Sequence, residues 1–276
     1  MKELSYKLIV SDFDGTLANH KNEVPPFVVE EVNRYVESGG IFAVCTGRIL
    51  PSILPRVREM GLGGLVIASQ GCQIAEISSG KLVKNTVFSP EQAYEICSYL
   101  EQLGVNIQLY TDSGFYSTLP KDEPHLNLYE SIIGIKAECI SASLAQYIKD
   151  FPPKFCKAAI LVNQEERQAL YEIIKERLGA RFDVTCSAKV LIEISPLGVT
   201  KGSALKILAE KFNVPIEKTI AVGDNLNDIS MIEIAGLGCA VENGEKELKD
   251  VADYVAPTCD EGAVADIIKK FGYKND

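Results

Sequence analysis

Two aspartates, Asp12 and Asp14, stand two residues apart just after the apolar run KLIV and Ser11. In such a pair, one carboxylate can act as a nucleophile while its neighbour donates and accepts protons. Gly15 follows and would relax the turn. An ordinary Asp-Gly turn, in which Asp12 ties down backbone amides, gives the same local pattern, so the pair needs support from elsewhere in the chain.

A second acidic segment, GDNLND, follows the apolar run TIAV and contributes Asp224 and Asp228. Three or four carboxylates converging in one sheet would repel one another strongly unless a divalent cation lay among them. Neither acidic segment contains His or Cys, and an all-oxygen ligand set favours Mg²⁺. The sequence therefore indicates a magnesium site.

Two further segments are suited to holding phosphate. Thr46, Gly47 and Arg48 follow the apolar run IFAVC, so the hydroxyl and amides there could bind phosphate oxygens, although Thr46 could equally cap a helix. Lys201 falls in the first turn of a predicted helix, where a cation opposes the helix dipole. A surface lysine is the simpler interpretation, but a bound anion would favour this placement.

Composition limits the class of protein. The 276 residues carry 38 acids and 28 bases, a formal charge of −10, and no basic stripe offsets the repulsion of a nucleic acid backbone. The eight cysteines form no C-x-x-C pair, and no apolar stretch is long enough for a membrane helix. We expect a cytoplasmic protein with reduced thiols that binds neither nucleic acid nor membrane.

The elements that must position these residues alternate along the chain. Apolar runs that end at residues 10, 45, 68 and 222 suit buried parallel strands, and the helical patterns at 25–40, 50–61 and 200–214 lie between them. This alternation predicts an α/β fold with a doubly wound parallel sheet. Ligands bind such sheets at the carboxyl ends of the strands, where the polar residues stand.

The segment 84–189 has a different order of predicted elements, with helical patterns at 89–104 and 165–179 among short strand patterns. Proline and glycine flank it at both junctions, as is common between domains. We predict an inserted α+β domain at 84–189, with 1–83 and 190–276 forming the core domain.

The motifs D-x-D-G-T at Asp12, T-G-R at Thr46, K-G at Lys201 and G-D-x-x-N-D at Asp224 occur in this order. Together they resemble the haloacid dehalogenase superfamily, whose core is Rossmann-like. The insertion between the second and third motifs resembles the class IIB cap of its Cof-type phosphatases. The resemblance covers essentially the whole chain.

This resemblance implies roles for the matching residues. Asp12 would be the nucleophile and Asp14 the general acid and base, while Thr46 and Lys201 would hold the phosphoryl group. Mg²⁺ would be bound by the Asp12 carboxylate, the Asp14 main-chain carbonyl, Asp224 and Asp228. The residues expected to bind substrate are Thr46, Gly47, Arg48, Gln70, Lys201 and Asn227.

The sequence departs from the family pattern at two places. Gln70 stands where Cof-type members usually have Asn, which shifts any polar contact by one methylene. Asn243 keeps its place but has different neighbours, and we retain it as a supporting residue. His20 and His125 lie outside the motifs, and we place His125 on a loop of the insertion.

The predicted function is Mg²⁺-dependent hydrolysis of small phosphate monoesters, such as sugar phosphates or phosphorylated cofactors, through an aspartyl-phosphate on Asp12. A covering cap argues against macromolecular substrates. A phosphomutase and a non-catalytic sensor of phosphorylated metabolites remain as alternatives. The protein is expected to be a monomer or a small homo-oligomer.

Overall fold

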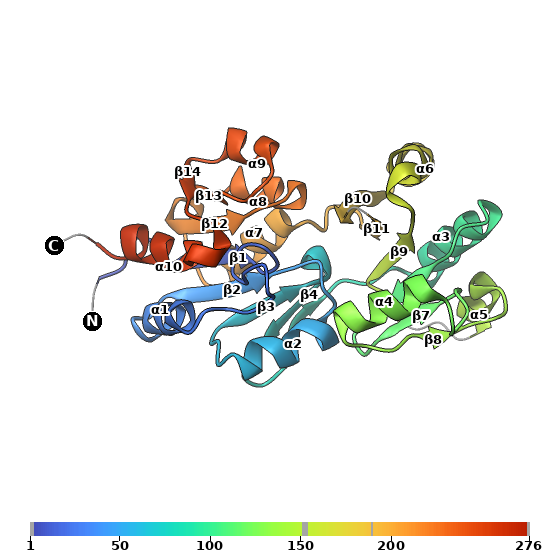
Figure 1. Cartoon of the computed structure of the whole chain (residues 1–276), viewed down its shortest axis with the longest axis horizontal. Helices are drawn as coiled ribbons and strands as arrows, with labels where there is room; N and C mark the ends of the chain where they lie inside the picture. The colour runs from blue at the N-terminus through green and yellow to red at the C-terminus, as the bar shows by residue number, and fades with distance from the viewer. Residues whose placement is uncertain (1–2, 151–153, 189, 275–276) are drawn as a thin grey trace.

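The structure, a computed structural model, describes residues 3–150, 154–188 and 190–274 and contains two sheets (Figure 1). The first sheet has the strand order β14-β13-β12-β1-β2-β3-β4-β5. Its parallel strands are β1 (Leu8–Asp12), β2 (Ile41–Cys45), β3 (Leu65–Ala68), β12 (Thr219–Gly223), β13 (Leu237–Val241) and β14 (Tyr254–Ala256). Two antiparallel strands, β4 (Gln73–Glu76) and β5 (Leu82–Asn85), complete one edge.

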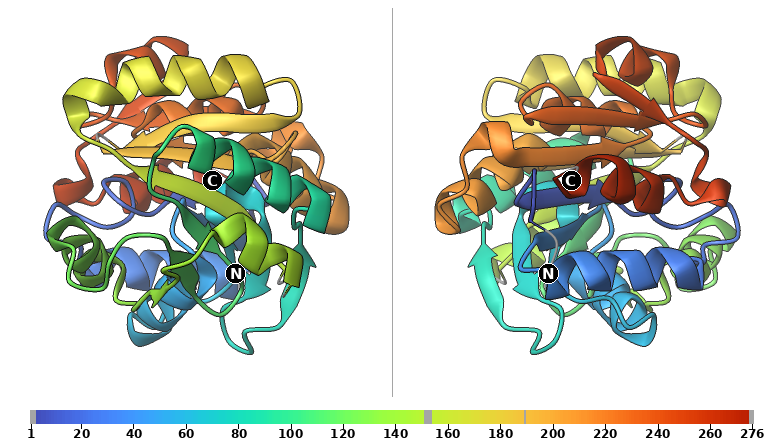
Figure 2. Two further views of the ribbon diagram at one scale, coloured as in Figure 1. Left: turned by 90° about the vertical axis from the view of Figure 1, so that its right-hand side faces the viewer. Right: turned by 90° about the vertical axis from the view of Figure 1, so that its left-hand side faces the viewer.

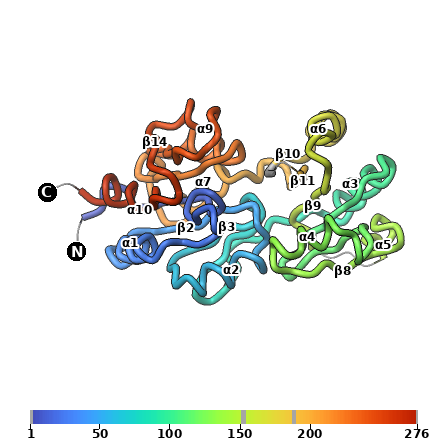
Figure 3. Tube along the Cα trace, in the orientation of Figure 1, coloured from blue at the N-terminus to red at the C-terminus, as the bar shows by residue number. Residues whose placement is uncertain are grey.

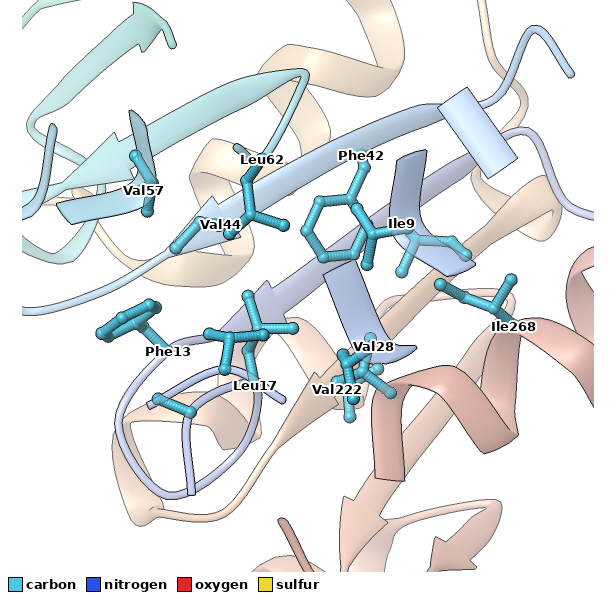
Figure 4. Packing of buried hydrophobic residues seen from close by; sticks show 14 of the residues in the cluster. Ile9, Phe13, Leu17, Val28, Phe42, Val44, Val57, Leu62, Val222 and Ile268 are labelled. Atoms are coloured by element: carbon cyan, nitrogen blue, oxygen red, sulfur yellow. The ribbon is translucent and has the colours of Figure 1, made fainter. Parts of the chain in front are cut away.

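Helices cover both faces of this sheet because its central strands are apolar on both sides. One face packs against α1 (Pro26–Glu37), α2 (Leu50–Glu59) and α10 (Ala263–Ile267), and the other against α7 (Lys201–Lys211), α8 (Ile229–Ile232) and α9 (Lys246–Val251). Figure 4 shows the first of these cores, to which Ile9 of β1, Phe42 of β2 and Val28 of α1 all belong. The predicted doubly wound parallel sheet is confirmed.

The second sheet is built from the insertion and has the order β10-β11-β9-β6-β7-β8. Its strands are β6 (Gln108–Tyr110), β7 (Phe115–Ser117), β8 (Glu138–Cys139), β9 (Lys157–Leu161), β10 (Phe182–Ala188) and β11 (Leu191–Pro196). The helices α3 (Pro90–Gln102), α5 (Leu144–Asp150) and α6 (Gln164–Leu178) pack on the side away from the first sheet (Figure 2). We call this second unit, with α4 (Pro124–Ile133), the cap.

Strand membership differs from the predicted domain boundaries. β5 continues the first sheet to Asn85, and β11 belongs to the cap sheet although it starts after residue 189, a position outside the described residues. The two crossings of the chain, after β5 and after β11, can be followed in Figure 3. The domain boundaries depend on which strands pair, and the partners are distant in sequence. Local composition therefore does not reveal these boundaries.

The prediction that His125 lies on a loop is wrong, because Pro124 begins α4 and His125 lies in its first turn. Proline suits the first helical position, where its missing N–H is not needed. The C-terminal end of α4 touches α2, where the Ser52 hydroxyl donates to the Ile133 carbonyl at 2.6 Å. In the part of the chain that is described, no helix combines the length and apolar character needed to span a membrane.

Candidate active site

Except for Lys201, the predicted site residues lie at or just after the carboxyl ends of four neighbouring strands. Parallel pairing sets Asp12 beside Cys45 and Cys45 beside Ile67, so the turns after β1, β2 and β3 emerge side by side. β12 pairs with β1 on its other edge, which adds Asp224 and the residues after it. Segments far apart in sequence therefore converge at this edge of the sheet.

Lys201 lies beneath this edge and contacts two carboxylates. Its Nζ is 2.5 Å from Oδ1 of Asp12 and 2.6 Å from Oδ1 of Asp228. Lys201 is 1% exposed, so the interpretation as a surface lysine is wrong. A buried cation between two acids fixes the Asp12 carboxylate in one orientation.

Asp228 and Asp224 are held by different partners. Oδ2 of Asp228 accepts from the backbone N–H groups of Asp224 and Asn225, at 3.0 and 2.9 Å. The Thr16 hydroxyl donates to Oδ1 of Asp224 at 3.0 Å. Gly15, with φ +81°, lies so close that a Cβ there would come within 2.8 Å of Oδ2 of Asp224, so the turn requires glycine.

Burial and mutual repulsion shift the titration of these groups. Burial raises the pKa of Asp12 well above its usual range, opposed by Lys201 and reinforced by the other acids. Burial also raises the pKa of Asp224 to about 6, and the charge of Asp228 adds to this effect. For Lys201, burial disfavours the ammonium, but Asp12 and Asp228 outweigh it and raise its pKa well above the ordinary value.

Two groups of side chains among the described residues have a spacing that could hold a metal ion. In one, Asp12, Asp224 and Asp228 each offer a carboxylate oxygen, and these atoms lie within 4.8 Å of one another. The other joins the exposed His20 and Asp260 with Cys259. The acidic group fits Mg²⁺, because its donors are all oxygen and because burial and the neighbouring acids raise the pKa of Asp12 and Asp224, an effect that a cation among them would oppose.

Asp14 and Arg48 form a two-pronged ion pair. Nε of Arg48 is 2.8 Å from Oδ2 of Asp14, and Nη2 is 2.6 Å from Oδ1. Nη1 of Arg48 also donates to the Ile132 carbonyl of the cap at 3.3 Å. One guanidinium therefore joins the expected general acid to the end of α4.

Thr46 takes no part in capping α2, because the residue at the N-cap is Ile49. The Thr46 hydroxyl instead accepts from the Arg48 backbone N–H at 3.1 Å and is buried. Thr46 also lines the cavity at the strand ends. The hydroxyl is thus available to a ligand there, and the helix-cap interpretation is wrong.

Sequence reasoning missed two residues of the cap, Lys157 and Glu193. Nζ of Lys157 is 2.5 Å from Oε1 of Glu193, and both side chains are almost fully buried. Lys157 also donates to the Gly47 carbonyl at 2.9 Å. The available signal was a charged residue in an otherwise apolar strand, at the start of KAAIL and within LIEIS.

A cavity of about 360 Å³ lies between the strand ends and the cap. The predicted residues that line it are Asp12, Asp14, Thr46, Gly47, Arg48, Gln70, Asp224 and Asn227. Lys201 and Asp228 are absent from its lining, since they lie beneath Asp12. Tyr129, Ile132 and Lys157 of the cap close the other side.

A second cavity, of about 460 Å³, lies within the cap and shares Tyr129 and Ile132 with the first. His125 belongs to its lining, together with apolar residues such as Leu128 and Leu170. Asn243 supports the site from outside both cavities, because its amide donates to the Gly15 carbonyl at 2.8 Å and accepts from the Cys259 N–H.

Comparison with known proteins places this geometry in a family. The family model for haloacid dehalogenase-like hydrolases matches residues 9–268. The phosphatase YwpJ of Bacillus subtilis is 33% identical, with 95% of this chain and 99% of YwpJ covered. The 5-amino-6-(5-phospho-D-ribitylamino)uracil phosphatase YwtE of Bacillus subtilis is 27% identical, with 94% and 96% covered.

The structure of the subclass IIB sugar phosphatase BT4131 superposes with a TM-score of 0.80, over 96% of this chain and 98% of BT4131. The two sequences are 19% identical, so this similarity is one of fold. The chain belongs to the haloacid dehalogenase-like hydrolase family. Within this family it is a phosphatase, as its curated relatives are, and its Rossmann-like core with an inserted cap shares the fold of the subclass IIB structure.

Proposed function

We propose that the chain hydrolyses small phosphate monoesters and that Asp12 carries the phosphoryl group from the ester to water. The contact of Lys201 with Asp12 at 2.5 Å, beneath a cavity at the strand ends, is the observation that supports this most. In-line displacement at phosphorus needs a nucleophile held in one orientation, and this contact would provide it.

The proposed reaction has two displacements. In the first, an oxygen of Asp12 bonds to phosphorus as the bond to the ester oxygen breaks, and Asp14 gives a proton to the departing alcohol. In the second, Asp14 takes a proton from water, the water oxygen bonds to phosphorus, and the bond to Asp12 breaks. Inorganic phosphate leaves, and both carboxyl groups return to their starting states.

Arg48 has to change partner during this cycle. It occupies both oxygens of Asp14 in the structure, so Asp14 can reach the ester oxygen only after Arg48 turns away. A phosphate oxygen in the same cavity offers the guanidinium an alternative anion, and Thr46, Gly47 and Asn227 lie around that position. We assign Arg48 to substrate binding on this basis.

Asp12, Asp224 and Asp228 would hold Mg²⁺, with the Asp14 main-chain carbonyl as a further ligand. When bound, the ion supplies positive charge that offsets the charge on the phosphate oxygens. The chain itself adds Lys201, whose raised pKa keeps it protonated.

The substrate class follows from the size of the cavities. About 360 Å³ accommodates a phosphoryl group with a small alcohol, and the neighbouring cavity of about 460 Å³ gives room for a larger leaving group. Sugar phosphates and phosphorylated cofactors fit these limits, as does the ribityl phosphate named for YwtE. Cytoplasmic location and a monomeric or small homo-oligomeric state are part of the same proposal.

The test is phosphate release from sugar phosphates, nucleotides, pyridoxal phosphate and an aryl phosphate, with Mg²⁺ and with chelator. Metal-dependent release by the wild type supports the proposal and ranks the substrates. Isomerised sugar phosphate without free phosphate would identify a mutase, and binding without turnover would identify a sensor. Either result overturns the proposal.

A further inference from the structure

A chain of polar side chains, three of them buried and the last half-buried, runs from the cap to the phosphate side of the cavity. It begins with the Lys157–Glu193 ion pair on the neighbouring cap strands β9 and β11. Nε2 of Gln70 donates to Oε2 of Glu193 at 3.1 Å, which carries the chain across the domain junction. Nδ2 of Asn227 then donates to Oε1 of Gln70 at 3.1 Å.

The charge of Glu193 fixes which way each amide points. A carboxylate can only accept, so Gln70 must turn its NH₂ group toward Glu193 and its carbonyl toward Asn227. Asn227 must then present its own NH₂ group to Gln70, which leaves a second N–H on that nitrogen. Lys157 favours the ionised form of Glu193, because its raised pKa keeps a cation 2.5 Å away.

The backbone around Gln70 is shaped for this contact. Gln70 has φ 59° and ψ 18°, a left-handed conformation that is uncommon outside glycine and costs free energy. A Cβ on Gly47 would come within 2.7 Å of Nε2 of Gln70, so only glycine lets the amide lie against the turn after β2. The longer reach of Gln, compared with Asn, spans from Asn227 to the cap.

We propose that Glu193 is a positioning residue that couples cap closure to phosphate binding by orienting the Gln70 amide and, through it, that of Asn227. When the cap closes, Glu193 orders both amides and their remaining N–H groups serve the phosphoryl group. When the cap opens, Gln70 loses the acceptor that fixes its orientation. This inference rests on the proposed function, since it requires phosphate to bind beside Asp12.

The test is a double-mutant cycle of Gln70→Asn and Glu193→Gln, read out by the Ki of inorganic phosphate and by kcat and KM separately. Gln70→Asn keeps the amide but shortens its reach, and Glu193→Gln keeps the shape but removes the charge. We expect each single variant to raise Ki and KM about tenfold, with a smaller change in kcat. The double variant should be no worse than either single variant, because both changes break one chain.

Multiplied effects, about 100-fold in the double variant, would show that Glu193 acts apart from Gln70 and overturn the inference. Unchanged Ki in both single variants would do the same. If Glu193→Gln does not fold, the double variant Lys157→Met with Glu193→Gln takes its place in the cycle. This variant removes both buried charges together, so neither is left without a partner. A wild type that releases no phosphate would instead defeat the proposed function, so the two failures are distinguishable.

Discussion

Arg48 donates hydrogen bonds to both carboxylate oxygens of Asp14, at 2.8 and 2.6 Å, and it also donates to the Ile132 carbonyl of the cap. The residue expected to move protons is therefore tied, through one guanidinium, to the element that covers the cavity. This contact connects the proposed general acid directly to α4 of the cap.

Replacing Arg48 should separate substrate binding from chemistry. Arg48→Ala removes a two-pronged anion ligand from the cavity, so we expect kcat/KM to fall about 100-fold, mostly through KM. Arg48→Lys keeps the charge but cannot bind with two N–H groups, and we expect an intermediate loss. Steady-state kinetics measure both. A fall in kcat alone would contradict the binding role.

Asp12→Asn should abolish turnover while the fold persists, because an amide is a poor nucleophile of the same shape. We expect kcat to fall by about 10⁴-fold or more. Lys201 keeps Asp228 as a partner in this variant, so circular dichroism should be unchanged. Near-normal activity of Asp12→Asn would contradict the assignment of Asp12 as the nucleophile.

Lys201→Met should destabilise the protein as well as inactivate it. The change leaves Asp12 and Asp228 buried without their cation, and such losses cost about 3–5 kcal/mol in the free energy of unfolding. Lys206→Met, at an exposed position of the same helix, is the matched control and should stay within about 0.5 kcal/mol. Equal stability of the two variants in urea would argue against the buried network.

The metal-free protein should lose stability with rising pH through Asp224. Its folded-state pKa of about 6 lies above the ordinary value of 3.8, so the folded chain binds more protons between these limits. The free energy of unfolding therefore falls as pH rises from about 4 to 6, and the loss persists at pH 7. Asp224→Asn should restore up to about 2 kcal/mol of the lost free energy of unfolding at pH 7 and should have no such effect at pH 4.

The same variant should no longer gain stability from Mg²⁺. Thermal unfolding of the wild type and of Asp224→Asn, with Mg²⁺ and with chelator at both pH values, measures the two effects. An Asp224→Asn protein that is still stabilised by Mg²⁺ would remove Asp224 from the ligand set.

Ile132→Ser should change which esters the enzyme accepts. The side chain is 55% exposed and lines both cavities, so a polar residue there weakens contact with a large apolar leaving group. We expect KM for pyridoxal phosphate or an aryl phosphate to rise about tenfold, with little change for glycerol phosphate. Ile173→Ser, 49% exposed on α6 and outside both cavity linings, is the control. Equal effects on all esters would contradict the specificity role.

The sequence alone determined which residues of the core meet at one edge of the sheet. Asp12, Thr46 and Asp224 each follow a buried apolar run, and parallel strands must bring such ends to one edge of a sheet. Local pattern suffices there because strand, turn and polar residue are contiguous in the chain. The roles assigned to these residues remain predictions, which the experiments above address.

Only the tertiary structure decided how the cap meets the core. β11 joins the cap sheet because its edges pair with β9 and β10, and Glu193 reaches Gln70 from 123 positions away. Arg48 likewise reaches the Ile132 carbonyl of the cap, although the sequence suggested only a phosphate ligand. Such contacts depend on how two sheets pack together, and no local spacing encodes a distance between side chains on separate domains.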